Sequence, residues 1–471
     1  MNSGSGFMRR VKQVHFVGIG GAGMSGIAEV LLNLGYHISG SDLAANETVQ
    51  RLQEKGAQIY RGHAAANIEG ADVLVVSSAV KADNVEVIAA REQRIPVVAR
   101  AEMLGELMRF REGIAVAGTH GKTTTTSLTA SVLAEGGLDP TFIIGGLVNA
   151  FGSHARLGQG PYVVAEADES DGSFLLLQPV VAVITNIDHD HMDHYEGSFR
   201  RLRDAFLEFI HHLPFYGLAV LNIDDPEVAD LLPEVGRPVL TFGFDTRADV
   251  RALNVEQDEL TMSFDLLLPN QEPQRACIQL PGLHNVHNAL GAAAVAWELG
   301  VPAPTIVAGL AAFKGIGRRF ASVGELPLDD GAVTVYEDYG HHPTELEATI
   351  KAARGSWPER RLVVVFQPHR YSRTRDLFDE FARVLAETDV LVLTDVYAAG
   401  EAPIEGVTTP RLCQAVRSRG RVEPVYIPSL WDLPQELPNL LHANDVVLLL
   451  GAGDVGHLAS QLRAQGWSAA A

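Results

Sequence analysis

The stretch that decides the fold reads Ala117-Gly118-Thr119-His120-Gly121-Lys122-Thr123-Thr124. The apolar run 114–116 before it predicts a buried strand, and residues 125–133 after it predict a helix. A glycine turn between a strand and a helix points free backbone N–H groups and the positive end of the helix dipole at one spot. We therefore predict that this turn cradles phosphate groups.

The turn carries two side chains suited to a nucleotide and its metal. Lys122 adds a mobile positive charge for the terminal phosphates, and the Thr123 hydroxyl is a natural ligand for phosphate-bound Mg²⁺. The pattern departs from G-x-x-x-x-G-K-[ST], because Val116 stands at the first glycine position and Gly118 lies only three residues before Gly121. The alternative is a glycine- and threonine-rich turn with a solvated lysine, but G-K-T-T at a strand-to-helix junction favours phosphate binding.

The bulk composition describes an acidic chain of ordinary globular character. Its 471 residues suffice for two to four domains, 46% of them are hydrophobic, and the formal net charge is −21. This charge argues against non-specific nucleic-acid binding. The two cysteines, Cys277 and Cys413, form no disulfide framework and lack metal-ligand spacing, which fits a reducing cytoplasm. Residues 1–10 do not resemble a signal peptide, and no apolar run approaches the roughly 20 residues that span a bilayer, so we expect no membrane association.

A second glycine-rich turn lies near the N-terminus. A predicted strand over 14–17 leads into Gly18-Ile19-Gly20-Gly21-Ala22-Gly23-Met24-Ser25-Gly26, followed by a predicted helix over 27–35 and a strand over 36–42 that ends in Asp42. This is the βαβ layout of a nucleotide-binding half-domain, with a diphosphate on the glycine amides and Asp42 near a ribose. By itself the pattern is typical of NAD or FAD sites, and a tight turn without a ligand is the other interpretation.

The first domain is predicted to end near residue 111. Two more strands are expected over 73–78 and 96–98, with a helix over 85–94 between them. The short charged segment 109–113 then reads as the junction to a second domain.

Two further predicted strands end in ligand-capable side chains. One delivers Glu166-Ala167-Asp168-Glu169-Ser170-Asp171, and acids at the end of a strand that faces a phosphate loop are where Mg²⁺ is held. A solvated acidic loop is the alternative. The other, over 180–184, precedes His189, His191 and His194. These histidines alternate with acids and could indicate zinc. Because the partners are mostly hard oxygens, we favour His191 as a nitrogen ligand in a Mg²⁺ or Mn²⁺ site.

The rest of the chain predicts more α/β structure. Residues 218–270 read as a continuation of the second domain, and Asn285 and Asn288 lie one helical turn apart, where an amide can meet an adenine edge or cap a helix. Strands over 333–336, 362–366, 390–395 and 445–450 alternate with helices, which predicts a second doubly wound domain. The turn 451–454 looks like a nucleotide fingerprint but lacks basic or metal-binding company, so we interpret it as structural.

With these pieces in order, the whole chain resembles the Mur ligases of peptidoglycan synthesis. The resemblance rests on eight motifs: Gly18 to Gly26, Gly118 to Thr124, Glu166 to Asp171, Asp190 to Asp193, His284 to Asn288, Gly317 to Phe320, Asp338 to Pro343 and Gln367 to Tyr371. It implies three α/β domains: a Rossmann-like UDP-binding domain over 1–111, a central P-loop-type ATPase domain over 112–317, and a Rossmann-like domain over 318–471 that closes over both substrates.

The resemblance implies an ATP-dependent ligase that joins L-alanine to the carboxylate of UDP-N-acetylmuramate through an acyl phosphate, with Mg²⁺ or Mn²⁺. It implies ATP contacts by Gly118, Thr119, His120, Gly121, Lys122, Thr123, Thr124, Asn288, Arg319 and Asp338. It implies UDP-substrate contacts by Gly18, Gly20, Gly21, Gly23, Met24, Ser25, Asp42 and Ser78. Metal ligands would be Thr123, Glu166 and His191, and catalytic roles would fall to Lys122, His342 and Arg370.

Several alternatives stay open. Relatives that add later residues of the peptide stem commonly carry a carbamylated lysine in the central domain. The chain has no lysine between Lys122 and Lys314, which favours the alanine-adding branch. The nearest rival is a recycling ligase that joins a tripeptide to UDP-N-acetylmuramate. A nicotinamide-dependent oxidoreductase leaves the ATP loop unexplained, and a non-catalytic nucleotide-binding regulator is the third. Both a monomer and a homodimer are compatible with the sequence.

Overall fold

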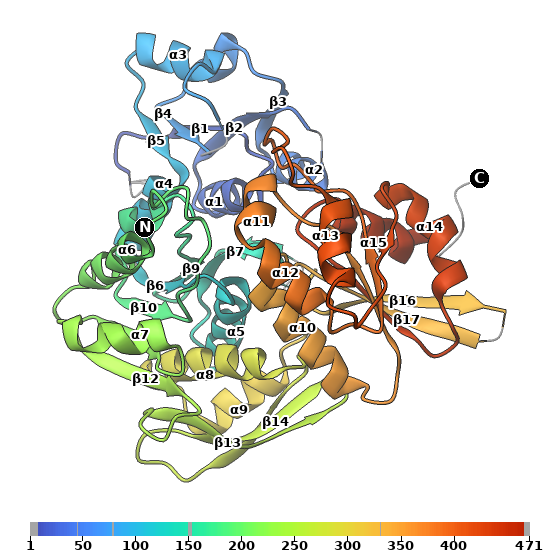
Figure 1. The fold of residues 1–471 in the computed structure, drawn as a ribbon. Coiled ribbons are helices and arrows are strands. Elements are labelled where there is room, and N and C mark those ends of the chain that lie inside the picture. The colour runs from blue at the N-terminus through green and yellow to red at the C-terminus, as the bar shows by residue number, and fades with distance from the viewer. Residues whose placement is uncertain (1–7, 45, 78–79, 149–152, 330, 466–471) are drawn as a thin grey trace. The chain divides into compact units, whose positions relative to one another are not determined.

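Mostly parallel strands with helical crossovers build three sheets in the computed structural model, which describes residues 8–44, 46–77, 80–148, 153–329 and 331–465 (Figure 1). The chain divides into two compact units: residues 1–253, 264–276 and 287–314 form the first, and residues 254–263, 277–286 and 315–471 the second. The predicted three-part α/β architecture is confirmed. Among the described residues, no helix has the length and apolar character needed to cross a membrane.

The N-terminal sheet is entirely parallel. Its strand order is β3 (Gln58–Arg61), β2 (His37–Asp42), β1 (Gln13–Val17), β4 (Val73–Val76) and β5 (Val97–Ala99). Its helices are α1 (Ala22–Asn33), α2 (Glu47–Glu54), η1 (Ala65–Ile68), α3 (Val85–Glu92) and α4 (Arg100–Arg109). The order reverses between β1 and β4, and doubly wound sheets bind ligands at such a switch point. The strands and the helices predicted here are confirmed, with ends that differ by a few residues.

A buried polar cluster lies on one face of this sheet, around the Glu86 carboxylate of α3. Ser41 Oγ donates to Oε2 at 2.5 Å, Asn67 Nδ2 donates to Oε1 at 2.6 Å, and His63 Nδ1 lies 3.2 Å from Oε2. Burial would raise the pKa of Glu86, but the donor groups of His15, Ser41 and Asn67 lower it to about 2. The carboxylate is therefore ionised inside the domain.

The middle sheet places the phosphate-binding candidate at its centre. Its strand order is β15 (Gln274–Ile278), β14 (Thr261–Leu267), β13 (Val250–Asp258), β12 (Val239–Gly243), β11 (Leu218–Asn222), β10 (Val181–Ile184), β6 (Glu112–Ala117), β9 (Tyr162–Glu166), β7 (Thr141–Val148) and β8 (Ser153–Arg156). The accompanying helices are α5 (Lys122–Glu135), η2 (Ser173–Leu176), α6 (Phe199–His211), α7 (Pro226–Leu231), η3 (Leu232–Glu234), α8 (Leu283–Glu298) and α9 (Ala303–Ala311). Because β9 and β10 both pair with β6 in parallel, the carboxyl ends of these three strands meet at one edge.

The prediction of continued α/β alternation over 218–270 is wrong beyond β12. Only two residues, 259–260, join β13 to its sheet neighbour β14, and a connection this short can join only antiparallel strands. In β14 the side chains of Met262, Phe264 and Leu266 are buried while those between them are more exposed. This alternation is typical of an antiparallel strand with one buried face.

The C-terminal sheet belongs to the second unit. Its strand order is β16 (Ala321–Leu328), β17 (Gly331–Asp338), β21 (Val446–Leu450), β18 (Leu362–Phe366), β19 (Val390–Leu393) and β20 (Val425–Tyr426), with only β16 antiparallel to its neighbour. Its helices are α10 (Pro343–Ser356), α11 (Tyr371–Asp376), α12 (Phe378–Leu385), α13 (Thr409–Arg417), η4 (Leu430–Asp432), α14 (Leu433–Glu436), η5 (Leu437–Leu440) and α15 (Val455–Gln465). The turn after β21 is filled by the protein itself, because Arg318 Nη2 donates to the carbonyl oxygens of Gly451 and Gly453 at 3.2 and 3.4 Å. These bonds fit the structural interpretation of this turn.

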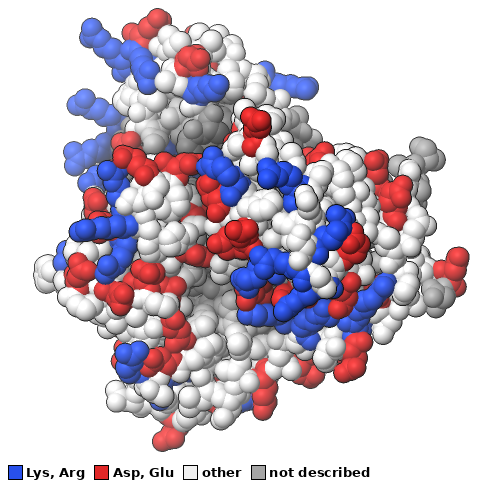
Figure 2. Space-filling model, viewed as in Figure 1, with Lys and Arg blue, Asp and Glu red and all other residues white. Residues whose placement is uncertain are grey.

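Basic side chains gather over α10, α12 and α13 of this unit, with acids between them (Figure 2). Lys351 and Arg383 both pair with Glu347 at 2.6 Å, and Arg354 pairs with Asp389 at 2.6 Å. Exposed ion pairs of this kind contribute roughly 0–1 kcal/mol each. The cluster is therefore a surface ion-pair network in which these three cations are already paired.

Candidate functional site

The phosphate-loop candidate joins β6 to α5 and needs both of its glycines. Gly118 has φ +131° and Gly121 has φ +83°, values that favour glycine. A Cβ at Gly118 would lie 2.0 Å from Thr185 Oγ1, and one at Gly121 would lie 2.5 Å from Asn288 Oδ1. Close approach by neighbouring elements, as well as backbone geometry, therefore excludes a side chain at both positions.

The loop is held by the segment that follows β10. The His120 N–H donates to Asn186 Oδ1 at 2.8 Å, and Thr185 Oγ1 donates to the His120 carbonyl at 2.6 Å. The His120 Nε2 lies 2.9 Å from Asp188 Oδ2. These contacts hold both the backbone and the imidazole ring of His120, a predicted ATP contact.

Lys122 is the first residue of α5, and three acceptors surround its ammonium. Its Nζ donates to the carbonyls of Gly118 and Thr119 at 2.7 and 3.1 Å and to Glu169 Oε2 at 2.8 Å. Burial would lower the pKa of Lys122, but the carboxylates of Glu169 and Asp168 raise it, so the ammonium stays charged. The acid run was predicted as a metal-binding segment. The structure shows in addition that its fourth residue is the ion-pair partner of the lysine.

The predicted metal ligands start from the same sheet edge. Glu166 is the last residue of β9, and its Oε1 accepts the Gly145 N–H of β7 at 2.9 Å. Thr123 is the second residue of α5, and His191 lies in the turn after β10 with φ +56°. A carboxylate, a hydroxyl and an imidazole match the hard, mainly oxygen ligands of Mg²⁺ or Mn²⁺. That Thr123 and Glu166 hold one ion, and Glu166 and His191 a second, stays a prediction.

The three histidines after β10 contact different neighbours. The His189 ring stacks on Phe199 with centroids 4.0 Å apart, and His194 meets Tyr195 edge-on at 4.9 Å. His191 Nε2 lies 3.5 Å from Asp190 Oδ2. This divergence does not favour the zinc interpretation.

Asn288, the predicted adenine contact, lies on α8 close to the start of α5. Its Oδ1 accepts the Thr125 hydroxyl at 3.1 Å and faces Gly121. The side chain thus packs beneath the phosphate loop, and its contact with adenine stays a prediction. Its neighbour His287 forms a pair that sequence reasoning missed, with Nε2 2.6 Å from Asp224 Oδ2.

The N-terminal glycine turn is tied to the acid at the end of β2. The Gly20 N–H donates to Asp42 Oδ2 at 2.8 Å, and Asn46 Nδ2 donates to the Gly20 carbonyl at 3.2 Å. Gly18 adopts φ +80° directly after β1. Asp42 therefore touches the turn itself, and its predicted ribose contact is untested.

The remaining predicted UDP contacts differ in their placement. The side chains of Met24 and Ser25 are buried in the body of α1. Gly21 precedes α1, and Gly23, its second residue, lies against the Arg100 side chain. Ser78 lies outside the described residues.

The predicted C-terminal site residues all belong to the second unit. Asp338 ends β17, and its carboxylate accepts the N–H groups of Phe320 and Gly340 at 2.8 Å each. The Arg319 guanidinium lies 5.1 Å from the centre of the Tyr339 ring. His342 caps α10, where it is buried and its Nδ1 accepts the Thr344 N–H at 3.3 Å. Arg370 has φ +71°, a left-handed conformation that is uncommon outside glycine.

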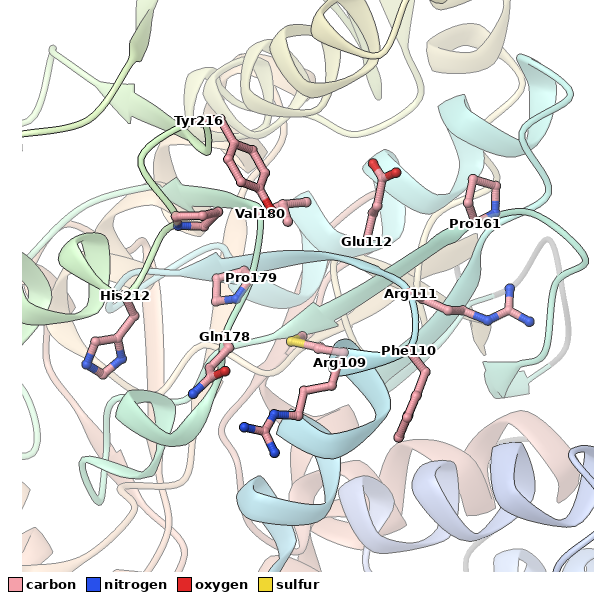
Figure 3. A pocket seen from close by; sticks show the side chains of 12 residues that line it. Arg109, Phe110, Arg111, Glu112, Pro161, Gln178, Pro179, Val180, His212 and Tyr216 are labelled. Carbon is pink, nitrogen blue, oxygen red and sulfur yellow. The ribbon is translucent and has the colours of Figure 1, made fainter. Parts of the chain in front are cut away.

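A pocket of about 620 Å³ opens at the opposite end of the middle sheet (Figure 3). It lies where β6, β9, β10 and β11 begin, whereas the phosphate loop follows the carboxyl end of β6. None of the predicted site residues lines it. Its lining residues are Met108, Arg109, Phe110, Arg111, Glu112, Pro161, Gln178, Pro179, Val180, His212, Pro214 and Tyr216.

Solved structures similar to this chain include two ligases from cell-wall metabolism. The UDP-N-acetylmuramate-alanine ligase MurC from Thermotoga maritima is 29% identical, with a TM-score of 0.80 over 95% of this chain and 97% of that one. A murein peptide ligase from Psychrobacter arcticus is 25% identical, with a TM-score of 0.71 over 98% of this chain and all of that one. A MurF ligase from Thermotoga maritima at 17% identity and a TM-score of 0.61 shares the fold.

Models of three domains of one family match in sequence order. The model of the Mur ligase family catalytic domain matches residues 13–112, that of the Mur ligase middle domain matches 116–296, and that of the Mur ligase glutamate ligase domain matches 318–453. Together with the phosphate loop and its acid-rich neighbours, these matches identify the chain as a member of the Mur ligase family, which carries out ATP-dependent ligation in peptidoglycan synthesis.

Proposed function

We propose that this chain joins L-alanine to the carboxylate of UDP-N-acetylmuramate, with ATP converted to ADP and phosphate. The observation that carries the choice of substrate is the higher structural similarity to the alanine ligase from Thermotoga maritima, with a TM-score of 0.80 against 0.71 for the murein peptide ligase from Psychrobacter arcticus. The lack of any lysine between Lys122 and Lys314 supports the same choice, because no carbamylated lysine can form in that segment of the central domain.

The first step is attack of the substrate carboxylate on the γ-phosphorus of ATP, which forms an acyl phosphate and releases ADP. The amine of L-alanine then attacks the acyl carbon, and phosphate leaves from the tetrahedral intermediate. Phosphoryl transfer depends on positioning and on stabilising charge. Lys122 supplies a fixed positive charge at the loop, and the N–H groups at the start of α5 point at the same phosphates.

Lys122 must exchange hydrogen-bond acceptors before its ammonium can contact a phosphate. Its three acceptors in the structure are two loop carbonyls and Glu169. A triphosphate would take the place of the carbonyls, while Glu169 would keep the ammonium oriented. Thr123 and Glu166 would hold one Mg²⁺, and Glu166 and His191 a second. Bound Mg²⁺ neutralises phosphate charge.

The C-terminal residues are assigned by analogy. Arg319 and Asp338 would contact ATP, and His342 and Arg370 would face the carboxylates of muramate or alanine. Asn288 would approach the adenine. UDP would lie on the turn from Gly18 to Gly23 with Asp42 at the ribose, and the domain boundaries would fall at 111/112 and 317/318.

The test is phosphate release from ATP with UDP-N-acetylmuramate and either L-alanine or the tripeptide L-alanyl-γ-D-glutamyl-meso-diaminopimelate. We expect release with L-alanine and little with the tripeptide. The reverse result would favour the recycling ligase, whose specific support is the similarity to two murein peptide ligases, the Psychrobacter arcticus one and one from Neisseria meningitides at 32% identity over 65% of this chain. No release with either acceptor would overturn both assignments.

A further inference from the structure

An arginine whose side chain has no partner among the described residues lies against the N-terminal glycine turn. Arg100 is the first residue of α4, and Gly23 is the second residue of α1. A Cβ built on Gly23 would lie 2.9 Å from Arg100 Nη1 and 3.5 Å from its Cζ. The guanidinium therefore packs on the backbone of the turn, in space that only a glycine leaves open.

This guanidinium is unusual in such an acidic chain. Arg100 is partly buried, yet across the described part of the chain it has no hydrogen bond and no ion pair. On the same helix, Arg109 is exposed and pairs with Glu106 at 2.9 Å. Taking a cation out of water is unfavourable unless an anion or acceptor compensates for it. In a chain with 58 acidic and 37 basic residues, the missing partner points to an anion that a ligand supplies.

The helix that Arg100 contacts, α1, lies between the two predicted nucleotide sites of the first unit. Helix α1 packs against α4, β7 and β8. One turn after Gly23, a Cβ on Gly26 would lie 3.1 Å from Ile143 of β7 and 3.3 Å from Ala155 of β8. Strand β7 also carries Gly145, whose N–H donates to the metal-ligand candidate Glu166.

We propose that Arg100 binds the diphosphate of the uridine nucleotide substrate. The inference rests on the proposed function and adds a substrate-binding residue to it. The N-terminus of α1 offers N–H groups and a positive dipole end to an anion at this turn. A guanidinium beside it adds two parallel N–H donors in the planar arrangement that matches phosphate oxygens. The diphosphate would satisfy the arginine, and Gly23 would let the two approach.

The experiment compares uridine with UDP as ligands of the complete chain by isothermal titration calorimetry. We expect Arg100→Met to weaken UDP binding by about 10- to 100-fold, the effect of losing hydrogen bonds to a charged group. Uridine, which lacks the diphosphate, should bind the variant as it binds the wild-type chain. The matched control is Arg109→Met, which removes a guanidinium from the same helix and should change neither affinity.

Two more variants keep the test decisive if Arg100→Met disturbs folding, which thermal unfolding would reveal. Arg100→Lys keeps the charge but loses the paired donors, so it should weaken UDP binding less. Gly23→Ala places a methyl group where the guanidinium lies and should also weaken UDP selectively.

Each outcome decides the question. Equal UDP affinity in the wild-type chain and Arg100→Met would refute the inference and leave the proposed ligase activity standing. Unchanged UDP affinity with reduced turnover would also refute it, and would point to the substrate carboxylate as the anion. Parallel weakening of uridine and UDP would indicate general disruption of the site and overturn the diphosphate contact. A wild-type chain that binds no UDP would remove the predicted substrate site and this inference together.

Discussion

The Lys122–Glu169 pair should be strongly coupled, because both of its ions are nearly removed from water. The exposed fractions of the two side chains are 16% and 1%, and the N–O distance is 2.8 Å. At an effective dielectric constant of about 20, the attraction at this distance is roughly 6 kcal/mol before desolvation. Desolvation of the two ions offsets several kcal/mol of this attraction. We therefore expect a coupling free energy of about 2 kcal/mol.

A double-mutant cycle measures this coupling. Lys122→Met leaves a buried carboxylate unpaired and Glu169→Gln leaves a buried ammonium without its counter-charge, so each single change should cost about 3 kcal/mol. The double variant should cost at least about 2 kcal/mol less than the sum of the two single changes. Because a chain with two compact units need not unfold in one step, the free energy is read from native-state hydrogen exchange of the amides in α5.

A surface pair supplies the control for the cycle. Lys351 and Glu347 lie 2.6 Å apart on α10, but the lysine side chain is 74% exposed. Their coupling should be about 0.5 kcal/mol or less. If the Lys122–Glu169 cycle is additive to within the same 0.5 kcal/mol, then Glu169 does not hold the ammonium, and its proposed orienting role in catalysis fails.

Four other outcomes test the site and the fold. Lys122→Ala should lower turnover at least about 10²-fold in the phosphate-release assay, the scale of losing one preorganised charge-stabilising donor, and retained activity would end that assignment. Gly118→Ala should abolish measurable ATP binding in calorimetry, because its methyl group would lie 2.0 Å from Thr185 Oγ1 at φ +131°. Lowering of the pKa of Glu86 from 4.5 to about 2 should stabilise the first unit by about 3 kcal/mol at pH 7. That contribution is lost as the pH falls from about 4.5 to 2. The stability of Glu86→Gln in urea unfolding should therefore depend less on pH over this range than that of the wild-type chain. Equal pH dependence of the two would contradict the ionised state of Glu86. Arg370→Ala should reduce turnover at least about tenfold, and near wild-type rates at all alanine concentrations would remove Arg370 from the site.

The sequence predicted the parallel strands well because they are buried on both faces. Strands β1, β6, β10 and β18 are short apolar runs bounded by glycine or polar residues, and this pattern has few other interpretations. It failed for residues 250–270, where alternating strands were taken for further α/β structure. It also left out β16, whose sequence of Ala321 to Leu328 contains a glycine and a proline and lies at the sheet edge.

The site could be predicted only where chemistry is local in sequence. Each glycine turn and the acid run is a continuous stretch of sequence that directly follows a predicted strand. Their place at the carboxyl ends of the strands could therefore be predicted. The partners that fix them are not contiguous: Glu169 lies 47 residues from Lys122, and Arg100 meets Gly23 from another helix. Such pairs depend on how crossover helices pack, and no spacing rule encodes that.

The shortened phosphate loop shows how one element compensates for another. Val116 occupies the usual first-glycine position, and the structure places it inside β6, fully buried between β9 and β10. The turn is therefore only four residues long, from Gly118 to Gly121. The segment that follows β10 holds this turn, since the Thr185 hydroxyl donates to the carbonyl of His120, and the Asp188 N–H donates to Thr119 Oγ1 at 2.9 Å. The departure from the common motif and the polar residues at the end of β10 thus belong together in one turn, which we propose binds phosphate, and a change in either should disturb the other.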